Sequence, residues 1–279
     1  MMLPRLGILA GGGQLPVRII DACRKNGRPF FVVAFENQTE PATVAETPHA
    51  WVRLGAGGKT ISILRQEMVD ELVLAGAIRR PSLRDLRPDS WTARFLARTG
   101  VAMAGDDGML SALVRELEEA EGYRVLAAHE LLPDALADLG TYGAIEPDAL
   151  ALIDIERGIE VARRIGALDV GQAVVVQQGI VLALEAAEGT DAMVARSARL
   201  RRAGPGGVLV KIKKPGQIDS ADLPTIGEGT VVAAADAGIR GIAIEAGGTL
   251  VVDREALVTK ADAAGLFVTG VRVEETACG

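Results

Sequence analysis

The sequence predicts an α/β protein of two domains, the first with a mostly parallel, Rossmann-like sheet and the second with a mixed α/β arrangement. Three observations predict this fold class. Short aliphatic runs alternate with helix-like segments, aromatic residues make up only 3% of the chain, and the first aliphatic run ends in consecutive glycines. Strands buried on both faces of a parallel sheet are aliphatic, and alternation with helices is typical of βαβ units.

The N-terminal domain is expected to span residues 1–132. Its predicted strands are short apolar runs, at 5–9, 30–35, 71–75 and 123–127. Its predicted helices lie between these runs, at 15–26, 59–69, 82–98 and 107–121. Pro16 in the first turn and Gly27 just past the end support the bounds of the first helix.

Residues 133–147 mix Pro, Gly and Asp, interrupt the alternation, and are predicted to link the two domains. The C-terminal domain is then expected to span 148–279. Its predicted strands are 173–176, 180–184, 208–211 and 242–245. Its predicted helices are 148–165, 192–200 and 231–237, and 250–269 is expected to form strand, helix and strand.

Composition excludes several classes of protein. The net charge of −7 and the isoelectric point of about 5.1 do not favour a nucleic-acid-binding protein. Two cysteines far apart and two histidines predict neither a disulfide framework nor a histidine-based zinc site, and favour a cytoplasmic setting. The start of the chain is expected to be a strand rather than a signal peptide, and no apolar run reaches the roughly 20 residues of a membrane span.

Glycine-rich turns in the first domain are candidate phosphate-binding elements. Gly12, Gly13 and Gln14 follow the first strand, and Gly76 precedes Arg79 and Arg80 after a later strand. Backbone amides at such turns can bind an anion, although a plain tight turn is the alternative, and the spacing does not match the dinucleotide fingerprint. Lys59 follows a glycine run that lacks the first glycine of a P-loop. Gly105, Asp106 and Asp107 are candidates for ligand binding or for helix capping.

A denser polar cluster lies between Glu185 and Asp222. Glu185, Glu188, Thr190 and Asp191 follow a predicted strand, and three lysines at 211, 213 and 214 lead through Gln217 to Asp222 and Thr225. Phosphoryl chemistry uses such groups, because carboxylates bind Mg²⁺ or position water and cations neutralise phosphate oxygens. Capping acids and a solvated lysine run are the alternative.

Together these segments resemble the LpxI family, the UDP-2,3-diacylglucosamine pyrophosphatases of lipid A biosynthesis. The resemblance extends over nearly the whole chain, through LAGGGQLP at 9–16, GDD at 105–107, LDVGQ at 168–172, EGTDAM at 188–193, KPGQ at 214–217 and DLPTIG at 222–227. It implies Mg²⁺-dependent hydrolysis of a UDP-sugar pyrophosphate to UMP and 2,3-diacylglucosamine 1-phosphate. It also implies a lipid-bearing substrate, transient contact with the inner face of the cytoplasmic membrane, and a nucleotide- or sugar-binding first domain beside a catalytic second one.

The resemblance also assigns roles to residues. Asp222, Glu188, Asp191, Lys211 and Lys214 are expected to be catalytic, and the first three of these to bind metal. The expected substrate-binding residues are Gly12, Gly13, Gln14, Lys59, Gly76, Arg80, Gly105, Asp106, Asp107, Gln178, Thr190, Gln217 and Thr225. The chain departs from the family pattern at Ile218 and Ser220, where an Asp and an Arg are expected. These departures leave a non-catalytic nucleotide-sugar sensor open as an alternative, and the glycine-ended first strand leaves an NAD(P)-binding oxidoreductase open. Assembly into a homodimer also stays open.

Overall fold

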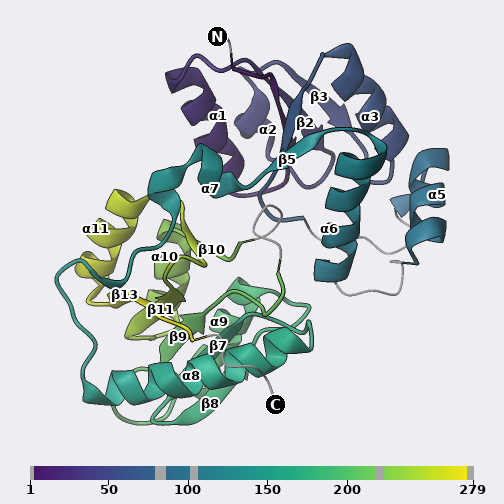
Figure 1. The fold of residues 1–279 in the computed structure, drawn as a ribbon. Helices are drawn as coiled ribbons and strands as arrows, with labels where there is room; N and C mark the ends of the chain where they lie inside the picture. The colour runs from purple at the N-terminus through teal and green to yellow at the C-terminus, as the bar shows by residue number, and fades with distance from the viewer. Residues whose placement is uncertain (1–2, 79–85, 101–105, 218–222, 275–279) are drawn as a thin grey trace. The chain divides into compact units, whose positions relative to one another are not determined.

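The structure is a computed structural model that describes residues 3–78, 86–100, 106–217 and 223–274 (Figure 1). The chain divides into two compact units, with the division between Pro133 and Asp134. The predicted α/β class is confirmed in both units.

The first unit contains a five-stranded, all-parallel sheet with the order β3-β2-β1-β4-β5. Its strands are β1 (Leu6–Ala10), β2 (Phe30–Phe35), β3 (His49–Val52), β4 (Glu71–Ala75) and β5 (Arg124–Leu126). The strand order reverses between β1 and β4, which is the topological switch point where open parallel sheets bind ligands. β3 was not predicted, because a four-residue strand without an aliphatic run has little signal in the sequence.

Helices connect these strands. They are α1 (Leu15–Lys25), α2 (Pro41–Val44), α3 (Gly57–Gln66), α5 (Ser90–Thr99), α6 (Asp106–Arg115), the π-helix η2 (Glu116–Ala120) and α7 (Ala128–Leu131). Leu15, Ile19, Ile20 and Cys23 form the buried stripe of α1, as its spacing predicts. The predicted helix 82–98 differs from α5. This helix begins at Ser90, because Asp89 caps it by accepting the Thr92 amide. Residues 82–85 of the predicted helix lie outside the described part of the chain.

The second unit contains a six-stranded mixed sheet with the order β6-β13-β11-β9-β7-β8. Its strands are β6 (Gly140–Tyr142), β7 (Ala173–Gln177), β8 (Ile180–Leu184), β9 (Val208–Lys211), β11 (Gly241–Glu245) and β13 (Phe267–Val271). β9, β11 and β13 are parallel, whereas β6, β7 and β8 each pair antiparallel with a neighbour. A two-stranded sheet joins β10 (Thr225–Ile226) to β12 (Leu250–Val251).

Helices cover both faces of this second sheet. They are α8 (Ala149–Ala167), α9 (Thr190–Ser197) with the 3₁₀ turn η4 (Ala198–Leu200), α10 (Glu228–Asp236) and α11 (Arg254–Ala264). Ile155 of α8 packs with Val174 and Val210 on one face. Met193 of α9, Val231 of α10 and Leu257 of α11 pack on the other. The unit is thus a three-layer α/β/α arrangement with two apolar cores.

The linker prediction for 133–147 needs correction. After the 3₁₀ turn η3 (Pro133–Ala135), this segment belongs to the second unit, because β6 pairs with β13. The buried Tyr142 hydroxyl accepts a hydrogen bond from the Asp138 amide at 2.6 Å. Its Pro, Gly and Asp residues interrupt the hydrophobic pattern, so the three-residue strand β6 could not be predicted from the sequence.

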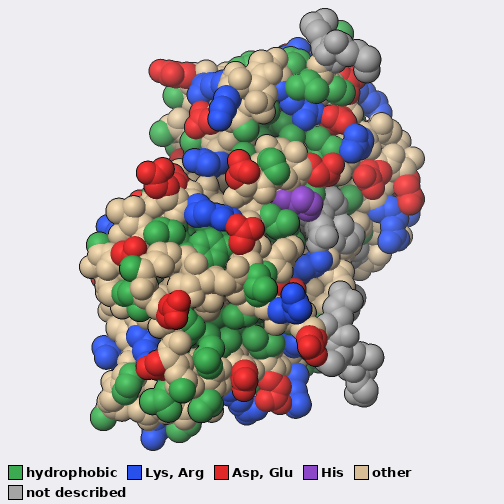
Figure 2. Space-filling view, turned by 60° about the vertical axis from the view of Figure 1, so that its left-hand side comes forward, with side chains coloured by type: hydrophobic (Ala, Val, Ile, Leu, Met, Phe, Trp, Pro, Cys, Tyr) green, Lys and Arg blue, Asp and Glu red, His purple; other side chains and the backbone are tan. Residues whose placement is uncertain are grey.

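No helix in the described ranges is long and apolar enough to cross a membrane. On the face in Figure 2, acidic and basic side chains are interspersed rather than gathered into one large region of a single sign. This distribution agrees with the exclusion of a global nucleic-acid-binding field.

Candidate active site

The carboxyl ends of β9 and β11 bring polar side chains to one edge of the second sheet. Lys211 ends β9 and is only 8% exposed. Its ammonium Nζ donates to the Thr225 carbonyl oxygen at 3.0 Å, which joins the main sheet to β10. Glu245 ends β11, and its Oε2 accepts the Lys213 amide at 2.8 Å.

The turn that follows Lys211 is held by side-chain contacts. Lys214 Nζ lies 2.7 Å from Asp169 Oδ1, and the Lys214 amide donates to Gln217 Oε1 at 3.1 Å. Gln217 is buried although it is polar. Its side-chain oxygen accepts the Lys214 amide, and its backbone amide donates to the Lys214 carbonyl at 3.2 Å. The chain therefore enters segment 218–222 from a well-defined turn.

A buried carboxylate lies at the same edge. The Glu185 amide donates to the Ala173 carbonyl at 2.9 Å, and Ala173 pairs with Lys211 across β7 and β9. The carboxylate of Glu185, 7% exposed, accepts the Gln172 amide at 2.9 Å and the Thr190 hydroxyl at 2.6 Å. We call this set the polar edge; its members are Asp169, Gln172, Glu185, Thr190, Lys211, Lys213, Lys214, Gln217, Thr225 and Glu245.

Five members of the polar edge had no predicted role: Asp169, Gln172, Glu185, Lys213 and Glu245. Glu185 and Lys213 belonged to the predicted polar cluster, whereas the other three were not singled out. A signal for Glu245 was present, because it ends a strand that was predicted, and parallel strands bring their carboxyl ends to one edge. Asp169 and Gln172 precede β7 in a segment that resembles the family, but no pattern indicated that Asp169 pairs with Lys214.

Three of the predicted residues are placed differently. Gln178 lies in the β7–β8 hairpin at the opposite edge of the sheet, where its side chain donates to the Ala203 carbonyl at 3.0 Å. Its φ of 55°, with 74° at Gly179, fits the type I′ turn of a two-residue hairpin, so its position has a structural reason. Glu188 and Asp191 are exposed, outside the buried network.

The expected metal trio includes a carboxylate that already has a cationic partner. Glu188 Oε1 lies 2.6 Å from Arg196 Nη2, and this hydrogen bond lowers the pKa of Glu188. Among the described residues, no three His, Cys, Asp or Glu side chains gather to hold a metal ion. Glu188 and Asp191 thus do not form a metal site by themselves. Asp222 lies outside the described residues, as do Arg80, Gly105 and the side chains of Asp106 and Asp107, whose backbone begins α6.

At the switch point of the first sheet, the loops after β1 and β4 bind each other. The Gly12 amide donates to the Ala77 carbonyl at 2.8 Å, and the Ala77 amide donates back at 3.0 Å. A Cβ at Gly76, where φ is 88°, would lie 2.4 Å from the Gly12 carbonyl oxygen. Glycine is therefore required here for close backbone approach. Gly13 and Gln14 are exposed beyond this pair, at the start of α1.

The glycine run before Lys59 has a structural partner. The Gly58 and Lys59 amides donate to Asp89 Oδ2 at 2.8 and 3.4 Å. A Cβ at Gly57 would lie 2.4 Å from the Trp91 ring, so the turn packs directly on α5. The amides that were expected to face a phosphate are thus occupied by a carboxylate of the chain itself, while the Lys59 side chain is exposed.

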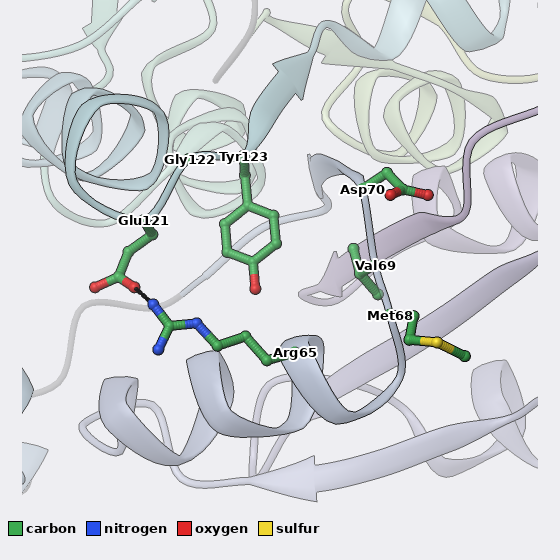
Figure 3. Close-up of a pocket in the computed structure, with 7 residues that line it drawn as sticks. All are labelled: Arg65, Met68, Val69, Asp70, Glu121, Gly122 and Tyr123. Carbon is green, nitrogen blue, oxygen red and sulfur yellow. Dashed lines mark hydrogen bonds and ion pairs between the residues drawn. The ribbon is translucent and has the colours of Figure 1, made fainter.

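A hollow of about 360 Å³ lies at the amino-terminal edge of the first sheet (Figure 3). Arg65 and Glu121 form a 2.7 Å ion pair on its rim, and Figure 3 shows the Tyr123 ring between Arg65 and Val69. None of the predicted site residues lines it. It is at the opposite end of β4 from Gly76, away from the switch point.

Comparison with known proteins places the whole chain in one family. The family model of the LpxI N-terminal domain matches residues 5–135, and the model of the LpxI C-terminal domain matches residues 138–269. The chain belongs to the LpxI family. A relative named UDP-2,3-diacylglucosamine pyrophosphatase LpxI, from Caulobacter vibrioides, is 42% identical over 278 residues, which cover 97% of this chain and 99% of the relative. The resemblance inferred from the motifs is confirmed, and the family's two domains correspond to the two units of the fold.

Proposed function

We propose that this LpxI-family protein hydrolyses the pyrophosphate of UDP-2,3-diacylglucosamine to UMP and 2,3-diacylglucosamine 1-phosphate in lipid A biosynthesis. The full-length relationship to a pyrophosphatase of that name carries the proposal. The polar edge supports it, because lysines and carboxylates converge where phosphoryl chemistry needs them.

Lys211 is the best candidate for neutralising a phosphate oxygen. Its hydrogen bond to the Thr225 carbonyl holds the buried ammonium at the polar edge. The Lys214 ammonium forms an ion pair with Asp169, which precedes β7. We therefore assign Lys211 to the substrate's pyrophosphate and Lys214 to holding the turn beside segment 218–222. A preorganised cation in a buried setting stabilises developing negative charge without reorganising during the reaction.

Asp222 is proposed to position the attacking water. Asp222 directly precedes Leu223 in the sequence. The two residues that flank segment 218–222, Gln217 and Leu223, are both buried. A water molecule attacks one phosphorus, the bond from that phosphorus to the bridging oxygen breaks, and the two products each leave as a phosphate monoester. A carboxylate can accept the proton of that water.

Mg²⁺ is proposed as the cofactor. Mg²⁺ is usually held by one or two carboxylates together with substrate phosphates and water, so a three-carboxylate cluster is not required. Asp222, with the exposed Asp191 as a second candidate, would supply such ligands; the Arg196 ion pair makes Glu188 the weaker candidate. When bound, the ion would add positive charge beside the pyrophosphate.

The test is release of UMP from UDP-2,3-diacylglucosamine dispersed in detergent, with Mg²⁺ and with a chelator. We expect chelation to abolish UMP release, and Asp222→Asn and Lys211→Met each to reduce kcat by about 100-fold or more. Lys260→Met is the matched control, because Lys260 lies on α11 and pairs with Glu228 at 3.4 Å. Tight substrate binding without UMP release would favour the sensor instead, and NAD(P) binding would favour the oxidoreductase. Full turnover by Asp222→Asn would refute the role given to that residue.

A further inference from the structure

The second unit carries an unusually basic stretch. Residues 192–218 contain four arginines and three lysines and no Asp or Glu, although the whole chain has a net charge of −7. The lysines belong to the polar edge, whereas the arginines at 196, 199, 201 and 202 belong to α9, η4 and the loop that follows. The arginines therefore form a second basic feature, which the proposed reaction does not use.

This arginine segment runs along the edge strand β8. At one end, Arg196 Nη2 donates to the Leu184 carbonyl at 3.0 Å. At the other end, the Arg202 amide donates to Gln177 Oε1 at 2.9 Å, and Gln177 pairs with Ile180 at the start of β8. Segment 196–202 thus follows β8 from its last residue back to its first, with α9 packed against the sheet through Met193 and Val194.

All four arginines are exposed. Arg196 pairs with Glu188, but within the described residues no acidic side chain pairs with Arg199, Arg201 or Arg202. Exposed aliphatic side chains accompany them: Leu200 is 46% exposed and Ile180 is 44% exposed. We call this set the arginine surface; it consists of Ile180, Arg196, Arg199, Leu200, Arg201 and Arg202.

We propose that the arginine surface docks the protein onto an anionic phospholipid bilayer. Exposed arginines are attracted to negatively charged headgroups, and neighbouring aliphatic side chains can enter the boundary between headgroups and acyl chains. The proposal rests on the proposed function, because a substrate with two acyl chains resides in a membrane. The residues of the arginine surface were identified from their charge and exposure.

Charge and composition disfavour two other occupants. A second copy related by a twofold axis would set arginines against arginines, and like charges in contact are unfavourable. Single-stranded nucleic acid is bound with exposed aromatic side chains, whereas Tyr142 and Phe267, the aromatic residues of the second unit, are both buried.

The experiment measures co-sedimentation of the full-length protein with vesicles, without substrate. One vesicle is phosphatidylcholine alone, and the other contains about one third phosphatidylglycerol. We expect binding only to the anionic vesicle, with loss at high salt, because screening shortens the range of the attraction. Arg199→Gln/Arg202→Gln is expected to weaken this binding by about 10- to 30-fold, and Leu200→Ser to weaken it further.

The matched control is Arg157→Gln/Arg164→Gln, which removes the same charge from two exposed arginines of α8 that pair with Glu160. Equal weakening in the control, or no binding of the wild-type protein to anionic vesicles, would overturn the proposal. So would arginine-dependent dimerisation in sedimentation analysis, or arginine-dependent binding of an RNA oligonucleotide in place of vesicles.

Turnover separates this proposal from the proposed function. Arg199→Gln/Arg202→Gln is expected to match the wild-type protein on substrate dispersed in detergent and to be slower on substrate held in anionic vesicles. If the wild-type protein binds anionic vesicles but releases no UMP in detergent, the function fails and the docking surface stands. If UMP is released but vesicles are not bound, the reverse holds.

Discussion

Replacing Asp89 with alanine is expected to destabilise the first unit by about 2 kcal/mol. Its carboxylate caps α5 through the Thr92 amide at 2.9 Å and also accepts the Gly58 amide of α3 at 2.8 Å. Loss of an N-cap costs about 1 kcal/mol. The second bond is to a charged acceptor, and at this partly exposed site we count about 1 kcal/mol, below the usual range for such bonds.

The measurement is urea unfolding followed by tryptophan fluorescence. Both tryptophans, Trp51 on β3 and Trp91 on α5, lie in the first unit, so the signal reports on that unit alone. With a slope of about 2 kcal/mol per molar urea, Asp89→Ala should lower the midpoint by about 1 M. Asp21→Ala is the control, because Asp21 is exposed and forms a 3.4 Å surface contact with Arg24.

Acid should reduce the difference between the wild-type protein and Asp89→Ala. Partial burial raises the pKa of Asp89, but hydrogen bonds from the Thr92, Gly58 and Lys59 amides outweigh burial and bring the pKa below its ordinary value of 3.8. A depressed pKa stabilises the fold above pH 3.8, and this contribution is lost as the pH falls through the lower folded-state pKa. Equal urea midpoints for Asp89→Ala and Asp21→Ala at pH 7 would refute the capping role of Asp89. The glycine run before Lys59 would then again be a candidate anion-binding loop.

Other predictions concern single contacts. Gly76→Ala should leave little soluble protein, because its Cβ would lie 2.4 Å from the Gly12 carbonyl oxygen. Gly13→Ala, with open space around its Cβ, should lower the free energy of unfolding by only about 1 kcal/mol. Soluble yield and tryptophan fluorescence distinguish the two variants. Glu185→Ala should destabilise the second unit by about 2 kcal/mol in hydrogen exchange, since it leaves the part-buried Gln172 amide and Thr190 hydroxyl without their acceptor. Tyr142→Phe should cost about 1 kcal/mol by the same measurement, and no change would argue that 133–147 is a free linker after all.

Local pattern determined much of the fold. Four strands have the bounds that were predicted from their apolar runs: Phe30–Phe35, Glu71–Ala75, Ile180–Leu184 and Val208–Lys211. Pro16 and Gly27 bound the first helix for reasons of backbone conformation that lie within a few residues. The family motifs are likewise continuous stretches, so they could be recognised without coordinates. Short elements without a hydrophobic run, β3 and β6, could not be recognised.

The tertiary structure alone decided which polar groups meet. Asp89 binds an amide 31 residues earlier, and Glu185, Lys211 and Glu245 share an edge only because of the order in which β8, β7, β9 and β11 are arranged. Gln178 is close to Glu185 in the chain but lies at the other end of the hairpin. The sequence by itself therefore determined the fold class, most elements and the family. The partners of each charged side chain depended on strand order, because pairing between distant strands is set by the packing of the whole sheet rather than by neighbours along the chain.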